Sequence, residues 1–143
     1  MDDNRTIRIA VVDDRGSVVD EFEELFRIEL PNATVEKFET ADDALLAINE
    51  GEEWSHWIVD LMMPIGEQLS KKETDDGLST GIAIIKRLIN SGVSISGRIF
   101  AFTLRDVNLD DLGGDNRVIV LPKSEYTIMN VVLRVKEIDE EVA

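Results

Sequence analysis

The sequence lacks cysteine and has a single histidine among its 143 residues. Without cysteine there are no disulfide bonds, no thiolate catalysis and no cysteine-based zinc sites. No apolar run comes near the ~18 residues that a membrane-spanning helix needs. Residues 1–4 carry acid where a secretory signal peptide carries base, and the apolar h-region of a signal peptide does not follow them. We therefore expect a cytoplasmic protein that does not insert into a membrane.

Basic residues are scarce. Fifteen lysines and arginines face 30 aspartates and glutamates, which gives a formal charge of −15. A nucleic acid is therefore not expected as a ligand, because phosphate backbones are bound by clustered lysine and arginine side chains. Two interpretations of the acidic excess remain open. The acids could keep the protein soluble through mutual repulsion, or some of them could converge and hold a cation.

Apolar runs of strand length alternate along the chain with segments of helical periodicity. Strands are predicted at 7–12, 33–38, 56–60, 98–102 and 117–121. Apolar residues at helical spacing fill the intervals, although the last interval has room only for a short helix near 109–112, and Ser124 is a candidate cap for the final helix. The alternation predicts a doubly wound α/β domain with a parallel sheet. The length fits one domain that spans residues 1–143.

The stretch after the third predicted strand breaks this rhythm. Residues 65–76 (IGEQLSKKETDD) are polar, charged and aperiodic. A loop of this length in a compact domain is usually mobile or functional. We interpret it as a loop that is solvated rather than docked on a partner.

Five polar residues stand where predicted strands end: Asp13, Asp14, Asp60, Thr103 and Lys123. In doubly wound sheets, ligands bind beyond the carboxyl ends of the strands. Three carboxylates close together need retained protons or a neutralising cation, and oxygen ligands without histidine or cysteine suit Mg²⁺. Such an ion leaves positions open for phosphate oxygens, which the lysine and the threonine would also contact. Asp60 could then attack phosphorus and form an acyl phosphate.

Each of these residues also has an ordinary structural interpretation. Acids at strand ends often cap helices, and Asp13 or Asp14 could cap the first helix. The only histidine, His56, lies near the start of the third strand, opposite the predicted site, and we interpret it as a strand-edge side chain. The order and placement of the five polar residues together favour a functional site.

Over nearly its whole length, the chain resembles a receiver domain of the two-component response-regulator family. The most specific element is an aspartate followed three residues later by Met-Pro. The motifs that carry the resemblance are VVDD at 11–14, VDLMMP at 59–64, Asp76-Gly77, Thr103 and Lys123. The resemblance implies a flavodoxin-like, three-layer α/β/α fold with strand order 2-1-3-4-5. It also implies a stand-alone regulatory phosphoacceptor rather than an enzyme.

The resemblance further implies a role for each site residue. Asp60 would accept a phosphoryl group from a histidine kinase or a phosphotransfer protein, and Thr103 and Lys123 would contact that group. The phosphorylated domain would switch conformation and signal to a downstream protein, as a monomer or a weak dimer. Mg²⁺ would be bound by Asp13 (largely through water), Asp14, Asp60 and the backbone carbonyl of Met62.

Several positions depart from the pattern of that family. Asp-Gly usually follows Met-Pro closely, whereas here it comes later, so residues 65–76 look like an insertion beside the site. Leu104 replaces a small residue after the threonine, and Val120 replaces an aromatic residue before the lysine. Proline precedes Lys123 instead of following it, so we expect a trans bond between Lys123 and Ser124.

These departures keep other hypotheses open. The first alternative is a protein-binding module on a receiver fold that works without phosphorylation. Another is a phosphatase like the haloacid dehalogenases, which also form an aspartyl phosphate. The haloacid dehalogenases have a second aspartate two residues after the nucleophile, whereas this sequence has Met62 at that position.

Overall fold

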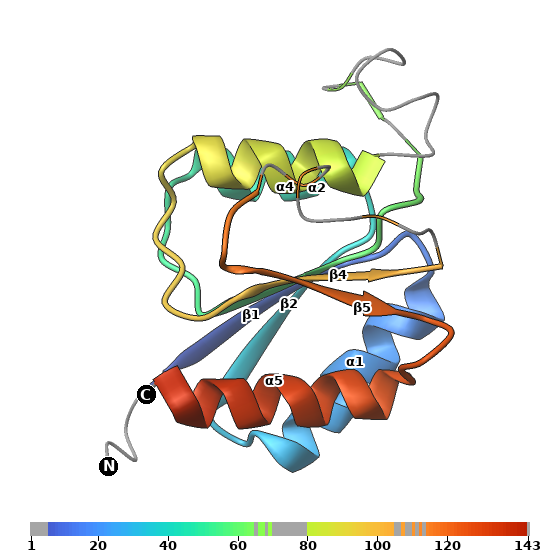
Figure 1. Cartoon of the computed structure of the whole chain (residues 1–143), viewed down its shortest axis with the longest axis vertical. Coiled ribbons are helices and arrows are strands. Elements are labelled where there is room, and N and C mark those ends of the chain that lie inside the picture. Colours follow the sequence, from blue (N-terminus) through green and yellow to red (C-terminus); the bar gives the residue numbers. More distant parts are fainter. Residues whose placement is uncertain are drawn as a thin grey trace.

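Five parallel strands form one sheet at the centre of the structure, a computed structural model that describes residues 6–64, 66, 67, 69, 80–104, 107, 110, 112 and 114–142. The strand order is β2-β1-β3-β4-β5, which confirms the predicted order (Figure 1). All neighbouring strands are parallel, so their carboxyl ends meet at one edge of the sheet. The strands are β1 (Ile7–Val12), β2 (Ala33–Phe38), β3 (His56–Val59), β4 (Ile99–Thr103) and β5 (Val118–Pro122).

Helices cover both faces of the sheet, as the prediction of three layers requires. Helices α1 (Gly16–Glu29) and α5 (Ile128–Val142) pack together on one face, and α2 (Ala41–Asn49) and α4 (Thr80–Asn90) pack together on the other (Figure 1). The described residues therefore form a doubly wound α/β/α fold. No helix among them is long and apolar enough to cross a membrane.

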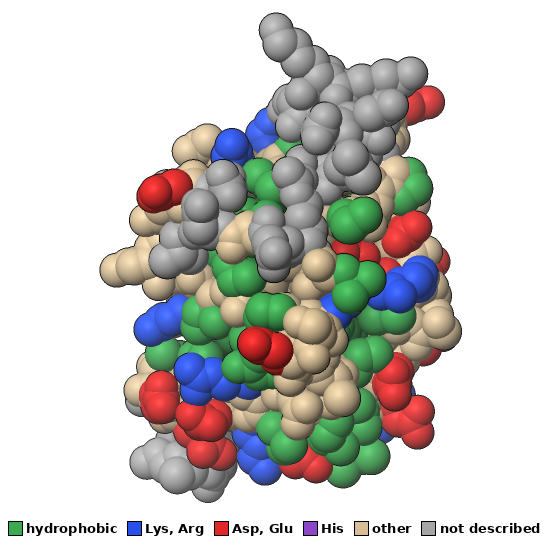
Figure 2. Space-filling view, turned by 45° about the vertical axis from the view of Figure 1, so that its right-hand side comes forward, with side chains coloured by type: hydrophobic (Ala, Val, Ile, Leu, Met, Phe, Trp, Pro, Cys, Tyr) green, Lys and Arg blue, Asp and Glu red, His purple; other side chains and the backbone are tan. Residues whose placement is uncertain are grey.

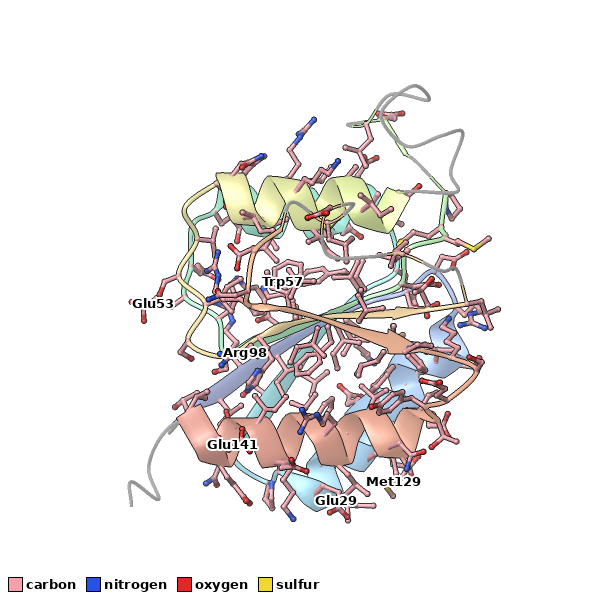
Figure 3. All side chains as sticks on the ribbon, viewed as in Figure 1. Glu29, Glu53, Trp57, Arg98, Met129 and Glu141 are labelled. Atoms are coloured by element: carbon pink, nitrogen blue, oxygen red, sulfur yellow. The ribbon has the colours of Figure 1, made fainter. Side chains whose placement is uncertain are left out.

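Strand β3 is buried on both sides, which explains the apolar run that precedes Asp60. Successive side chains of a strand point to opposite faces. Trp57, labelled in Figure 3, therefore packs under α2 and α4, as does Val59. Ile58 packs under α1 and α5. Burial of each such large side chain stabilises the fold by about 2 kcal/mol. The strand is thus fixed from both faces and delivers Asp60 to the carboxyl edge of the sheet.

Strand and helix boundaries differ slightly from the predicted ones. Strands β4 and β5 each begin and end one residue later than predicted, so Thr103 is the last residue of β4 and Lys123 follows β5. The prediction that Ser124 caps the last helix is wrong, because α5 begins at Ile128. Thr127 precedes it instead: its Oγ1 accepts a hydrogen bond of 3.1 Å from the backbone N–H of Asn130.

Two predicted segments lie largely outside the described residues. Of the short helix expected near 109–112, only Asp110 and Leu112 are described, and both lie in turns. Of the predicted insertion 65–76, only residues 66, 67 and 69 are described. The backbone N–H of Glu67 donates to both carboxylate oxygens of Asp42 at 3.0 Å, and the side chain of Leu69 is buried. This described part of the loop is therefore attached to the N-terminal end of α2.

Candidate functional site

The carboxyl edge of the sheet brings the predicted site residues to one place. Asp13 and Asp14 follow β1, Asp60 follows β3, Thr103 ends β4 and Lys123 follows β5. Backbone hydrogen bonds hold these ends in register. The N–H of Asp60 donates to the carbonyl of Val12 at 2.9 Å, and the N–H of Lys123 donates to the carbonyl of Thr103 at 2.8 Å. The sheet itself therefore sets the relative positions of the side chains.

Three carboxylates form the acidic part of the site. Asp13, Asp14 and Asp60 each place one carboxylate oxygen within 4.8 Å of the other two. Asp13 and Asp60 are buried, whereas Asp14 is exposed. Ligand oxygens about 2.1 Å from a Mg²⁺ ion lie roughly 3 to 4 Å apart, so a small contraction would bring these three to such an ion. The donor set and its spacing fit a hard divalent cation.

Two cationic side chains reach into this acidic cluster. The Nζ of Lys123 lies 3.6 Å from Oδ2 of Asp60 and 3.9 Å from Oδ2 of Asp13. Arg15 was not among the predicted site residues, yet its Nε and Nη2 donate to Oδ1 and Oδ2 of Asp13, both at 3.3 Å. Its position directly after the Asp13-Asp14 pair was the only signal in the sequence. The site therefore contains two cations as well as three acids.

Asp13 does not cap α1, although the ordinary structural interpretation of this residue was a helix cap. Helix α1 begins at Gly16, and its N-cap residue is Arg15, whose side chain makes no capping hydrogen bond. Oδ1 of Asp13 instead accepts from the backbone N–H of Arg15 at 2.9 Å. The carboxylate of Asp13 is therefore turned toward the site by the loop that leads into α1.

The environment of Asp60 disfavours its charged form. Burial raises the pKa of this carboxyl above its ordinary value, the positive charge of Lys123 opposes that effect, and the negative charge of Asp13 adds to it. The backbone N–H of Met62, which donates to Oδ1 of Asp60 at 3.2 Å, also favours the charged form. A bound divalent cation would favour it further, because positive charge stabilises a neighbouring carboxylate.

Helix α4 packs closely against the backbone that carries Asp60. The N–H of Gly81 donates to the carbonyl of Leu61 at 3.0 Å. A Cβ at position 81 would lie 2.2 Å from the carbonyl oxygen of Asp60, so any side chain there would force the helix and the strand end apart. The hydroxyl of Thr80 donates to the carbonyl of Met63 as well. The start of α4 thereby fixes the segment that follows Asp60.

A pocket of about 220 Å³ opens at Asp60, on the side of the molecule that Figure 2 brings forward. Two apolar side chains of its lining are exposed: Leu104 is 74% exposed and Met62 is 42% exposed. The pocket is lined by Asp14, Arg15, Asp60, Met62, Leu104 and Lys123.

Three further predictions concern Thr103, Val120 and the peptide bond after Lys123. Thr103 is 1% exposed, so its side chain lies in the interior at the end of β4. Val120, at the position where an aromatic residue was expected, is half-buried in β5. No cis peptide bond occurs among the described residues, so the bond between Lys123 and Ser124 is trans, as predicted.

The interpretation of His56 as a strand-edge side chain is wrong. His56 is completely buried at the start of β3, at the end of the strand away from Asp60. Its Nδ1 accepts from the backbone N–H of Arg98 at 3.1 Å, and its Nε2 lies 2.8 Å from Oδ1 of Asp139 in α5. Nδ1 accepts a hydrogen bond, so the ring proton lies on Nε2 and is donated to Asp139. The histidine joins β3 to α5 and takes no part in the site.

Comparison with solved structures shows that the fold is that of receiver domains. The BeF3-activated receiver domain of DrrB matches with a TM-score of 0.66 and 19% identity, over 95% of this chain and 99% of that chain. A CheY-like receiver domain protein from Methanospirillum hungatei matches with a TM-score of 0.66 and 19% identity, over 96% and 97%. The isolated REC domain of RcsB from Salmonella enterica, solved with phosphomimetic BeF3−, matches at 0.62 and 17%, over 85% and 80%. Neither a protein-family model nor a curated protein matches the sequence.

Proposed function

We propose that this chain is a phosphoacceptor receiver domain of a two-component system or phosphorelay, phosphorylated on Asp60. The observation that carries the proposal is the placement of Asp60. Its carboxylate lies in a pocket at the carboxyl edge of the sheet, with Lys123 at 3.6 Å and two further carboxylates beside it. The fold shared with receiver domains supports this function. The protein is then a regulatory phosphoacceptor and not a conventional enzyme.

The proposed reaction uses few protein groups. A carboxylate oxygen of Asp60 bonds to phosphorus while the bond between phosphorus and the donor atom breaks, which leaves an acyl phosphate and a released donor group. Lys123 neutralises the phosphoryl oxygens, and Thr103 contacts them once the group is in place. Mg²⁺ would offset charge between Asp60 and the incoming group. It would be held by Asp13 (through water), Asp14, Asp60 and the Met62 carbonyl.

Signalling follows from the link between Thr103 and Lys123. The N–H of Lys123 is bonded to the carbonyl of Thr103, so a shift of the threonine toward the phosphoryl group also shifts the start of the β5–α5 connection. Phosphorylation would then change the surface offered to a downstream protein. The donor would be a histidine kinase or phosphotransfer protein in the cytoplasm. We expect a monomer or weak dimer that does not bind nucleic acid, given the charge of −15.

We further propose that residues 1–143 form one receiver domain and that residues 65–76 are an insertion in it. This segment lies between β3 and α4 in the chain. The family that the chain resembles has a shorter connection at this point. The attachment of Glu67 to Asp42 supports a loop that lies beside the site.

The test is phosphorylation by acetyl phosphate in the presence of Mg²⁺, followed by intact-protein mass spectrometry. The wild-type chain should gain one phosphoryl group, and Asp60→Asn should gain none. Asp110→Asn, which changes an exposed aspartate outside the pocket, should be labelled like the wild type. An unlabelled wild type, or equal labelling of Asp60→Asn, contradicts the proposal.

One observation favours a second candidate function, a binding module that works without phosphorylation. Leu104 lines the pocket at Asp60 and is 74% exposed, at a position where the resembling family has a small residue. A partner that binds wild type and Asp60→Asn with equal affinity, before and after treatment with acetyl phosphate, would select this function. A change in affinity on phosphorylation would exclude it.

A further inference from the structure

Arg15 holds a carboxylate that the proposed metal site needs. We propose that Arg15 competes with the divalent cation for Asp13 and thereby sets the metal affinity of the site. This inference rests on the proposed receiver function only in its use of the same acidic cluster. Arg15 would act as a positioning residue, through Asp13, and not as a group that touches the phosphoryl donor.

The contacts of Asp13 show what a cation must displace. Both of its carboxylate oxygens accept from the guanidinium of Arg15 at 3.3 Å, and Oδ1 also accepts from the backbone N–H of Arg15 at 2.9 Å. The Nζ of Lys123 lies 3.9 Å from Oδ2. A carboxylate offers about four lone-pair sites. The three hydrogen bonds from Arg15 use three of these sites, and the charge of Lys123 faces the oxygen that has the fourth. A metal ion, or a water bound to it, therefore competes with the guanidinium for Asp13.

The difference in burial between Asp13 and Arg15 indicates which side chain moves when a cation binds. The side chain of Asp13 is 3% exposed, whereas that of Arg15 is 52% exposed. The guanidinium can therefore turn into water at little cost, while the carboxylate stays in the interior. The two guanidinium contacts are also long for charge-assisted hydrogen bonds, which usually measure about 2.7–2.9 Å. The backbone bond from Arg15 does not depend on the guanidinium, so Asp13 keeps its direction after the side chain leaves.

The charges of the site favour this exchange. Three carboxylates, Lys123 and Arg15 leave one net negative charge while the guanidinium is bound, and two once it has turned away. The two net negative charges that remain after the guanidinium has turned away match the charge of a divalent cation. While the guanidinium is bound, its positive charge repels such a cation. Lys123 is a poor candidate for the same exchange, because its side chain is only 12% exposed and lies closer to Asp60. Arg15 is thus the cation of the site that can leave.

The experiment is a titration of the metal-free protein with MgCl₂ at constant ionic strength and without phosphodonor, followed by backbone amide shifts in NMR spectra. Arg15→Ala should lower the Kd for Mg²⁺ by between about threefold and tenfold, the change expected for a half-exposed ion pair. The matched control is Arg27→Ala, which removes the same charge from a side chain that is 71% exposed and pairs with Glu23. It should leave the Kd within about twofold of wild type.

A double-mutant cycle ties the effect to Asp13. In an Asp13→Asn background, the further change Arg15→Ala should no longer tighten Mg²⁺ binding. Unchanged or weaker binding by Arg15→Ala, an equal gain from Arg27→Ala, or no binding by any variant would overturn the inference. Phosphorylation is scored separately with acetyl phosphate. If Arg15→Ala tightens Mg²⁺ binding but Asp60 is never labelled, the competition stands and the proposed function fails.

Discussion

At the scale of single residues, the stability of the fold and the chemistry of the site make opposite demands on Asp60. Burial is the main reason that its pKa is raised above the ordinary value of 3.8, although Lys123 opposes the shift. The stability linked to the protonated carboxyl is therefore complete below pH 3.8 and is lost as the pH rises through the raised pKa of the folded protein. The proposed role of Asp60 as a nucleophile requires an ionised carboxylate, so at neutral pH the fold carries the cost of that charge.

Asp60→Asn should accordingly stabilise the metal-free protein at pH 7.5. The expected gain in the free energy of unfolding is about 1.4 kcal/mol for each unit by which folding raises the pKa. The gain should shrink as the pH is lowered toward 3.8, where the wild-type carboxyl is protonated in the folded state. Urea unfolding at pH 7.5 and pH 4.5 measures both values. A less stable Asp60→Asn at pH 7.5 would mean that the ion pair with Lys123 outweighs burial.

At the scale of elements, one buried pair fastens α5 to the sheet. His56 in β3 and Asp139 in α5 are 0% and 2% exposed, and the imidazole donates to the carboxylate. His56→Leu removes this donor and leaves the carboxylate of Asp139 in the interior. We expect a loss of about 3 kcal/mol in the free energy of unfolding, measured in urea at pH 7.5. The site lies at the other end of β3, so labelling of Asp60 should persist in the folded variant.

The control for this pair removes both polar groups. The double variant His56→Leu, Asp139→Leu should recover much of the lost stability, because the buried carboxylate that lost the imidazole is then removed as well. A single variant that costs less than about 0.5 kcal/mol, or a double variant no more stable than the single one, would show that the pair is not what holds α5. Gly97 is part of the same arrangement, since a Cβ there would lie 2.0 Å from Cε1 of His56.

The sequence predicts an element well when the interactions that form it join residues close together in the chain. Periodicity is local, so the five strands and the edge that collects Asp60 and Lys123 could be predicted. Contacts between residues far apart leave no local pattern. The bond from His56 to Asp139 spans 83 positions, and a lone histidine next to a strand gave no sign of its partner. Arg15 was missed for another reason. In the sequence, a charged residue after two acids is as compatible with a solvent-exposed side chain as with one that contacts the acids.

At the scale of the whole molecule, acidic charge exceeds basic charge by 15, and this excess opposes compact folding through repulsion. Raising NaCl from ~10 mM to ~150 mM shortens the Debye length from ~30 Å to ~8 Å and should raise the Tm. Mg²⁺ should raise it further than NaCl of equal ionic strength, because binding to the folded state adds a specific contribution. That contribution is about 1.4 kcal/mol when Mg²⁺ is tenfold above its Kd.

A variant can separate general screening from binding at the site. Asp14→Asn changes an exposed carboxylate of the acidic cluster, so the Tm should still respond to NaCl while the extra response to Mg²⁺ is reduced. Glu21→Gln removes one charge from an exposed position on α1 and serves as the matched control, with both responses intact. Removal of Mg²⁺ with EDTA should return the wild-type Tm to its value in NaCl. If Mg²⁺ and NaCl of equal ionic strength raise the wild-type Tm equally, the acids only repel one another. The cluster of Asp13, Asp14 and Asp60 would then hold no ion.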